Sequence, residues 1–154
     1  TDSYIEHERG DKATTQQRID ESEKALKILG AEVVFLHIPD KSITEGNLAM
    51  ALHNLCIAMD YCPTEIYAPA WESGGNPIHN LVATVAKKMF TGVIPYMTYN
   101  SLNTKTKGRT IITPTDEEKE LKRRALACYP SQMDIKTTRP FFEHPEVLEW
   151  ESYQ

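Results

Sequence analysis

The stretch ESGGNPIHN, Glu72 to Asn80, decides the interpretation of this chain. It follows a strand-like run at residues 64–69 and precedes a helix-like run at residues 79–90. This order places a glycine-containing loop at the carboxyl end of a strand, where open α/β sheets form their ligand sites. His79 would then present an imidazole at the start of a helix, in reach of a metal ion. The alternative is that His79 is an ordinary solvated side chain.

Helix-like and strand-like segments alternate along the rest of the chain. Three helices are expected to begin at capping-box patterns, namely Thr14-x-x-Gln17, Ser42-x-x-Glu45 and Thr115-x-x-Glu118. Strands are expected at residues 32–39, 64–68, 93–99 and 109–113. The first of these is β-branched and apolar, so we expect a buried parallel strand with His37 in the core. The alternation predicts an α/β fold with a mostly parallel sheet.

Composition favours one soluble domain over residues 1–154. The chain is 40% hydrophobic and 25% charged, with a net charge of −5 from 17 basic and 22 acidic residues. The negative net charge and the lack of a Lys/Arg stripe in the sequence argue against a nucleic-acid partner. No apolar run is long enough to span a membrane, and the sequence shows no signal-peptide pattern. Three cysteines without CxxC spacing indicate reduced thiols in a cytoplasmic protein.

Four fragments together resemble the PIG-L/LmbE-like deacetylases. They are Arg18-x-x-Glu21-x-x-x-Ala25-x-x-x-Leu29-Gly30, Phe35-Leu36-His37-Ile38-Pro39-Asp40, Gly74-Gly75-Asn76-Pro77-Ile78-His79 and Lys122-x-x-Ala125-Leu126-x-x-Tyr129-x-Ser131-Gln132. Each fragment alone is common, but all four occur in the family's order. Members of that family remove acetyl groups from N-acetylglucosamine conjugates and related amides.

The resemblance implies a Rossmann-like sheet with helices on both faces and one zinc ion. It assigns His79 as a metal ligand, Arg18 and Asp40 as substrate-binding residues, and Asn76 to the catalytic position. Zinc held by three protein ligands keeps one place for water and lowers that water's pKa to about 7, which suits amide hydrolysis. Asn76 stands where many relatives have a histidine, and it can donate a hydrogen bond but cannot transfer a proton.

The chain also departs from the family pattern. The family's first strand ends in His-Pro-Asp-Asp, which supplies the other two metal ligands and a general base, and this motif is absent here. Thr1-Asp2-Ser3 resembles the end of the family's second strand, so we expect the first strand to be missing from this chain. Truncation, processing or a separate chain that carries the segment would each explain this. Ile78 replaces an aspartate that would orient the imidazole.

Two functions of different classes follow. The first is a zinc-dependent deacetylase acting on a glycoconjugate or small-molecule substrate, complete only with the missing segment. The second is a catalytically incomplete relative that binds a glycan or a protein. A nucleotide-binding module is disfavoured because Gly74-Gly75 does not form GxGxxG. Arg18 has the alternative of a surface helix charge, and Asp40 that of an ordinary Pro-Asp turn.

Overall fold

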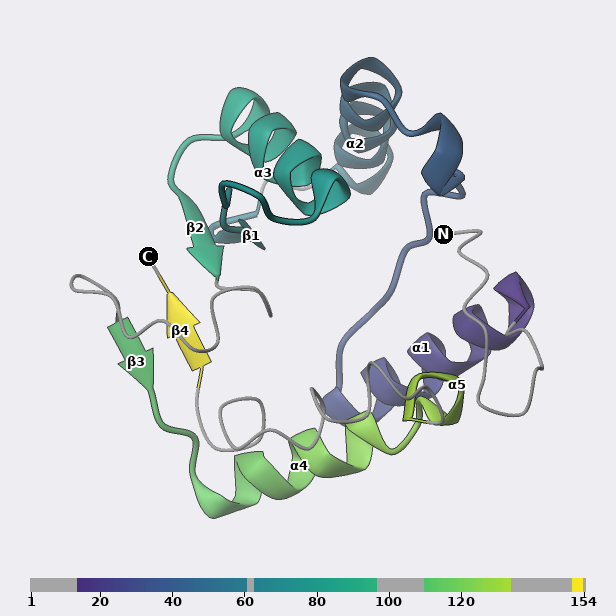
Figure 1. The fold of residues 1–154 in the computed structure, drawn as a ribbon, viewed down its shortest axis with the longest axis vertical. Coiled ribbons are helices and arrows are strands. Elements are labelled where there is room, and N and C mark those ends of the chain that lie inside the picture. The colour runs from purple at the N-terminus through teal and green to yellow at the C-terminus, as the bar shows by residue number, and fades with distance from the viewer. Residues whose placement is uncertain (1–13, 61–62, 97–109, 134–150, 154) are drawn as a thin grey trace. The chain divides into compact units, whose positions relative to one another are not determined.

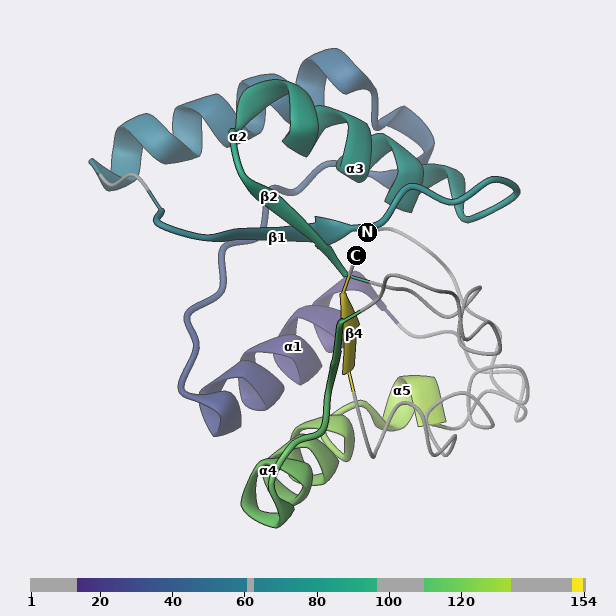
Figure 2. The same cartoon turned by 90° about the vertical axis from the view of Figure 1, so that its left-hand side faces the viewer.

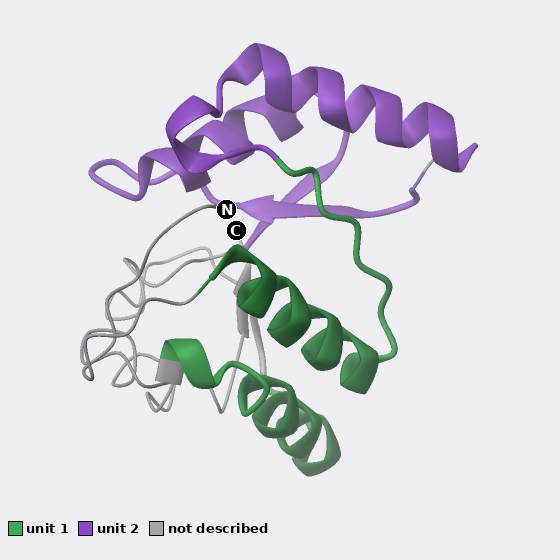
Figure 3. Ribbon diagram, turned by 90° about the vertical axis from the view of Figure 1, so that its right-hand side faces the viewer, with its two compact units in different colours: residues 1–37, 112–151 green, residues 38–111, 152–154 purple. Residues whose placement is uncertain are grey.

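The computed structural model describes residues 14–60, 63–96, 110–133 and 151–153. The chain divides into two compact units, with residues 1–37 and 112–151 in unit 1 and residues 38–111 and 152–154 in unit 2 (Figure 3). Helices and strands both occur, so the predicted α/β class is confirmed at that level. The single domain predicted over the whole chain stays a prediction.

Unit 1 is built on α1 (Thr15–Leu29), which packs against α4 (Asp116–Leu126) and the short α5 (Pro130–Met133) (Figure 1). Two alanines lie at the packed surfaces, Ala25 at 2% exposure and Ala125 at 6%. Small side chains let helices approach closely while still burying apolar surface. Unit 1 is therefore assembled from chain segments that are far apart in the sequence.

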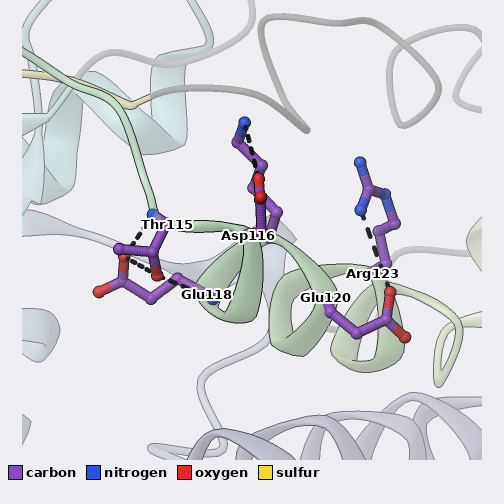
Figure 4. A network of polar contacts seen from close by, with 6 residues as sticks. Thr115, Asp116, Glu118, Glu120 and Arg123 are labelled. Atoms are coloured by element: carbon purple, nitrogen blue, oxygen red, sulfur yellow. Dashed lines mark hydrogen bonds and ion pairs between the residues drawn. The ribbon is translucent and has the colours of Figure 1, made fainter.

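Local capping explains where these helices begin and end. The Thr14 hydroxyl accepts a hydrogen bond from the Gln17 backbone N–H at 3.1 Å, so Thr14 caps α1 as predicted, but the Gln17 side chain donates to Glu21 at 3.3 Å and does not complete the predicted capping box. Gly30 ends α1 with φ of 68°, a left-handed conformation that glycine adopts without a Cβ penalty. At α4 the predicted capping box is present, since the Glu118 carboxylate accepts from the Thr115 N–H at 2.7 Å and the Thr115 hydroxyl accepts from the Glu118 N–H at 3.3 Å (Figure 4).

In unit 2, helices and strands alternate along the chain. Its elements are a 3₁₀ turn (Asp40–Ser42), α2 (Glu45–Met59), β1 (Ile66–Pro69), α3 (Pro77–Met89) and β2 (Val93–Tyr96). Two short strands, β3 (Thr110–Ile112) and β4 (Glu151–Tyr153), complete a sheet of order β1-β2-β4-β3. The β1–β2 pair is parallel, whereas Tyr96 of β2 pairs antiparallel with Tyr153 of β4.

The core of unit 2 lies where α3 covers the β1–β2 pair. α3 packs against both strands, and α2 packs beside α3 (Figure 1, Figure 2). Ala68 and Ala70 are almost fully buried on the strand side, and Ala83 and Val85 on the helix side, with 1–3% exposure. This packing holds α3 on the β1–β2 pair, and the loop between β1 and α3 connects the two packed elements.

Three sequence predictions are wrong in detail. Residues 31–39 form no strand, and Val34 is 54% exposed. A strand needs the backbone hydrogen bonds of a neighbour, and this segment has no ladder partner in the described part of the chain. His37 is accordingly exposed, with φ of 51°, and is not a core residue. α2 begins at Glu45, and its N-cap is Thr44, which forms a capping box with Asn47. The predicted capping box from Ser42 to Glu45 is therefore wrong.

Within the described ranges, no helix has both the length and the apolar character needed to cross a membrane.

Candidate functional site

The loop between β1 and α3 is shaped by its own hydrogen bonds. Asn76 is the N-cap of α3, and its Oδ1 accepts from the Ile78 N–H at 2.8 Å and the His79 N–H at 3.4 Å. Pro77 occupies the first helical position, where its missing N–H costs nothing. The predicted helix therefore starts two residues earlier than expected, and His79 lies within its first turn.

A second set of hydrogen bonds closes the loop from the helix side. The Asn80 side chain accepts from the Glu72 N–H and donates to the Glu72 carbonyl, both at 2.8 Å. The same carbonyl accepts from the Gly75 N–H at 3.0 Å. Gly74 sits between them with φ of 72°, a conformation that favours glycine. The residues from Glu72 to Asn80 thus form a closed, internally bonded loop.

The electrostatics of this loop favour a neutral imidazole. Burial lowers the pKa of His79 below its ordinary value of 6.5, while the negative charge of Glu72 acts in the opposite direction. A half-buried histidine in this setting is uncharged at neutral pH. Neutral imidazole is the form that binds metals or accepts protons, so the chemistry of His79 suits the role expected of it.

The oxygen and the nitrogen of the Asn76 side-chain amide have different roles. Its oxygen accepts the cap bonds of α3, and its Nδ2 is the donor group that a substrate oxygen would use. The catalytic role predicted for Asn76 stays a prediction, and a structural role is established beside it.

The side chains of Asp40 and Arg18 each contain one buried polar atom. Asp40 begins the 3₁₀ turn of unit 2, and Arg18 lies on α1 of unit 1. The Asp40 Oδ1 and the Arg18 Nη1 are both buried and have no hydrogen-bond partner among the described residues. Buried polar atoms in native proteins are nearly always bonded, so each exception calls for an explanation, such as a bound water or ion or a functional role. The substrate-binding role of these two residues stays a prediction.

One buried polar contact in unit 1 joins two of the fragments that carry the family resemblance. Glu21, 4% exposed, accepts from the Ser131 backbone N–H at 3.0 Å through Oε1 and from the Ser131 hydroxyl through Oε2. Gln132 donates to the same hydroxyl at 3.4 Å. Glu21 and Ser131 are 110 positions apart in the sequence. The contact fastens α5 to α1.

A complete metal site is not formed by the described residues. Across residues 14–60, 63–96, 110–133 and 151–153, no group of three His, Cys, Asp or Glu side chains could hold a metal ion. His79 fits a zinc ligand by its chemistry, but three protein ligands are the usual minimum. Further ligands would have to come from outside these residues.

Sequence reasoning missed Asn80 and the Glu21–Ser131 pair. Neither has a local signal, because a side chain that bonds a backbone eight or more residues away leaves no periodic pattern. A groove of about 530 Å³ beside Glu21, lined also by Gln17, Lys24 and Cys128, was not anticipated either.

No protein-family model matches this chain, and neither a curated protein nor a solved structure matches it.

Proposed function

We propose that this chain contributes to a metal-dependent amide hydrolase of the PIG-L/LmbE type, with a Rossmann-like sheet, acting on an N-acetylglucosamine-type conjugate. The observation that carries the proposal is that two buried atoms, Arg18 Nη1 and Asp40 Oδ1, have no hydrogen-bond partner within the part of the chain that the structure describes. These are the two residues to which the resemblance assigns substrate binding. A guanidinium N–H and a carboxylate oxygen are complementary to the hydroxyl groups of a sugar.

Two further observations support the proposal. The Glu21–Ser131 contact joins the first and last fragments of the resemblance, as residues of one packed unit would. His79, whose pKa is lowered by burial, stands at the start of a helix after a parallel strand, where ligand sites of α/β sheets form. In this proposal His79 is one zinc ligand, Asn76 Nδ2 donates to the developing oxyanion, and Arg18 and Asp40 orient the sugar.

The second candidate is a catalytically incomplete relative that binds a glycan or a protein, and the buried Arg18 and Asp40 atoms are equally consistent with it. The two candidates share Arg18 and Asp40 and differ in His79. A binder would need the hydroxyl-binding residues alone.

The test compares hydrolysis with binding in the full-length protein. Methyl N-acetyl-β-glucosaminide is supplied with zinc, and the released amine is measured, together with glycoside affinity by calorimetry. The deacetylase proposal expects amine release that is lost in His79→Ala and kept in the exposed control His53→Ala. Glycoside binding without amine release would replace it with the second candidate. If the protein neither binds the glycoside nor releases amine from it, both candidates are overturned.

A further inference from the structure

Asn80 uses its whole side-chain amide on one backbone position. Its Oδ1 accepts from the Glu72 N–H and its Nδ2 donates to the Glu72 carbonyl, each at 2.8 Å. This pair of bonds spans eight residues and reproduces the two-bond pattern of a strand neighbour. Without Asn80, the Glu72 N–H would lose this acceptor, and the Glu72 carbonyl would keep the Gly75 N–H but lose the Asn80 amide.

The helix itself does not require these bonds. α3 is already capped by Asn76, whose side chain accepts from the N–H groups of Ile78 and His79. The bonds of Asn80 are directed outward, to the far end of the loop. Their effect is to hold Glu72 against the first turn of α3, with the glycine turn closed between them.

We propose that Asn80 is a positioning residue for the site at this loop, holding Glu72 and the turn up to Asn76 in a fixed relation to the imidazole of His79. The inference rests on the proposed function for its catalytic consequence only. Asn80 itself touches no reacting atom. It follows His79 directly in the sequence, so the bonds that fix its side chain also fix the turn of helix that carries the imidazole.

Hydrogen exchange tests whether Asn80 holds the loop. In the full-length protein, Asn80→Ala should accelerate exchange of the Glu72 amide at least about tenfold, since loss of about 1.4 kcal/mol of local protection corresponds to a factor of ten. The amides of Val85 and Ala86, deeper in α3, should keep their wild-type rates. Thr84→Ala is the matched control, because the Thr84 hydroxyl bonds only the Asn80 carbonyl within the helix. An unchanged Glu72 rate in Asn80→Ala would overturn the proposal.

Kinetics test whether this holding serves the reaction. Asn80→Ala should lower kcat for the glycoside at least about tenfold with KM changed less than about twofold, because the reacting groups and not the sugar contacts are displaced. Asn80→Asp keeps the acceptor for the Glu72 N–H and should restore part of the rate. If Asn80→Ala turns over as fast as Thr84→Ala, Asn80 has no positioning role. If the wild-type protein releases no amine, the proposed function fails together with this catalytic role, while hydrogen exchange still decides whether Asn80 holds the loop.

Discussion

Replacing Glu21 with alanine should destabilise unit 1, because Glu21 makes its buried polar contact with Ser131. The substitution removes the acceptor of two buried donors, the Ser131 N–H at 3.0 Å and the Ser131 hydroxyl. Ser131 is 1% exposed, so both donors are buried where the carboxylate is lost. Each unsatisfied buried donor costs about 1–3 kcal/mol, which gives a loss of about 2–6 kcal/mol in the free energy of unfolding.

Urea unfolding followed by circular dichroism measures this loss as a shift in midpoint. Asp20→Ala is the matched control, because Asp20 is an exposed carboxylate on the same helix that accepts a hydrogen bond from the Gln16 amide at 2.7 Å. Its effect should stay within about 0.5 kcal/mol. Ser131→Ala removes one of the two donors and should cost about 1–3 kcal/mol. The double variant should lose less than the sum, since both changes remove the same interaction. A midpoint for Glu21→Ala equal to that of Asp20→Ala would refute the reasoning.

Three further predictions concern the candidate site. Arg18→Ala should raise KM with kcat nearly unchanged, by the loss of about 1.5–3 kcal/mol for a charge-assisted hydrogen bond; a large fall in kcat alone, measured in steady-state assays, would contradict this. Asn76→Ala should cost about 0.5–2 kcal/mol of stability through the lost cap and slow turnover by roughly 10²-fold, whereas Asn76→Asp, which keeps the acceptor, should preserve the thermal midpoint and lose only rate. Because burial lowers the folded-state pKa of His79, the unfolded chain binds its proton more tightly, so His79 should reduce stability progressively as the pH falls below its unfolded value of 6.5. Urea midpoints from about pH 7.5 to pH 5 should therefore fall more steeply in the wild type than in His79→Gln, and parallel curves would speak against a lowered pKa.

Helix boundaries set by local chemistry could be predicted from the sequence. The caps at Thr14 and Thr115 and the stop at Gly30 depend on residues within one turn, and all three are confirmed. The same locality misled the prediction at Ser42, where Thr44 two residues later offers the better geometry for the cap of α2.

Features that depend on distant partners could not be predicted in the same way. Residues 32–39 have the composition of a strand, but composition provides no hydrogen-bonding neighbour, and the segment is extended without a ladder among the described residues. Glu21 and Ser131 are 110 positions apart, and the sequence gives no sign that the two fragments containing them are hydrogen-bonded to each other. At the site, the order of strand, loop and helix placed His79 correctly at the start of α3, whereas the clamp by Asn80 required the folded loop.

Metal content tests the central claim most directly, because the proposed hydrolase depends on His79 as a zinc ligand. The full-length protein, dialysed against zinc and then against metal-free buffer, should retain about one equivalent by elemental analysis, as a site with three protein ligands does. His79→Ala should lose both the metal and the release of amine, while the exposed control His53→Ala keeps both. Wild-type zinc content in His79→Ala would contradict the account.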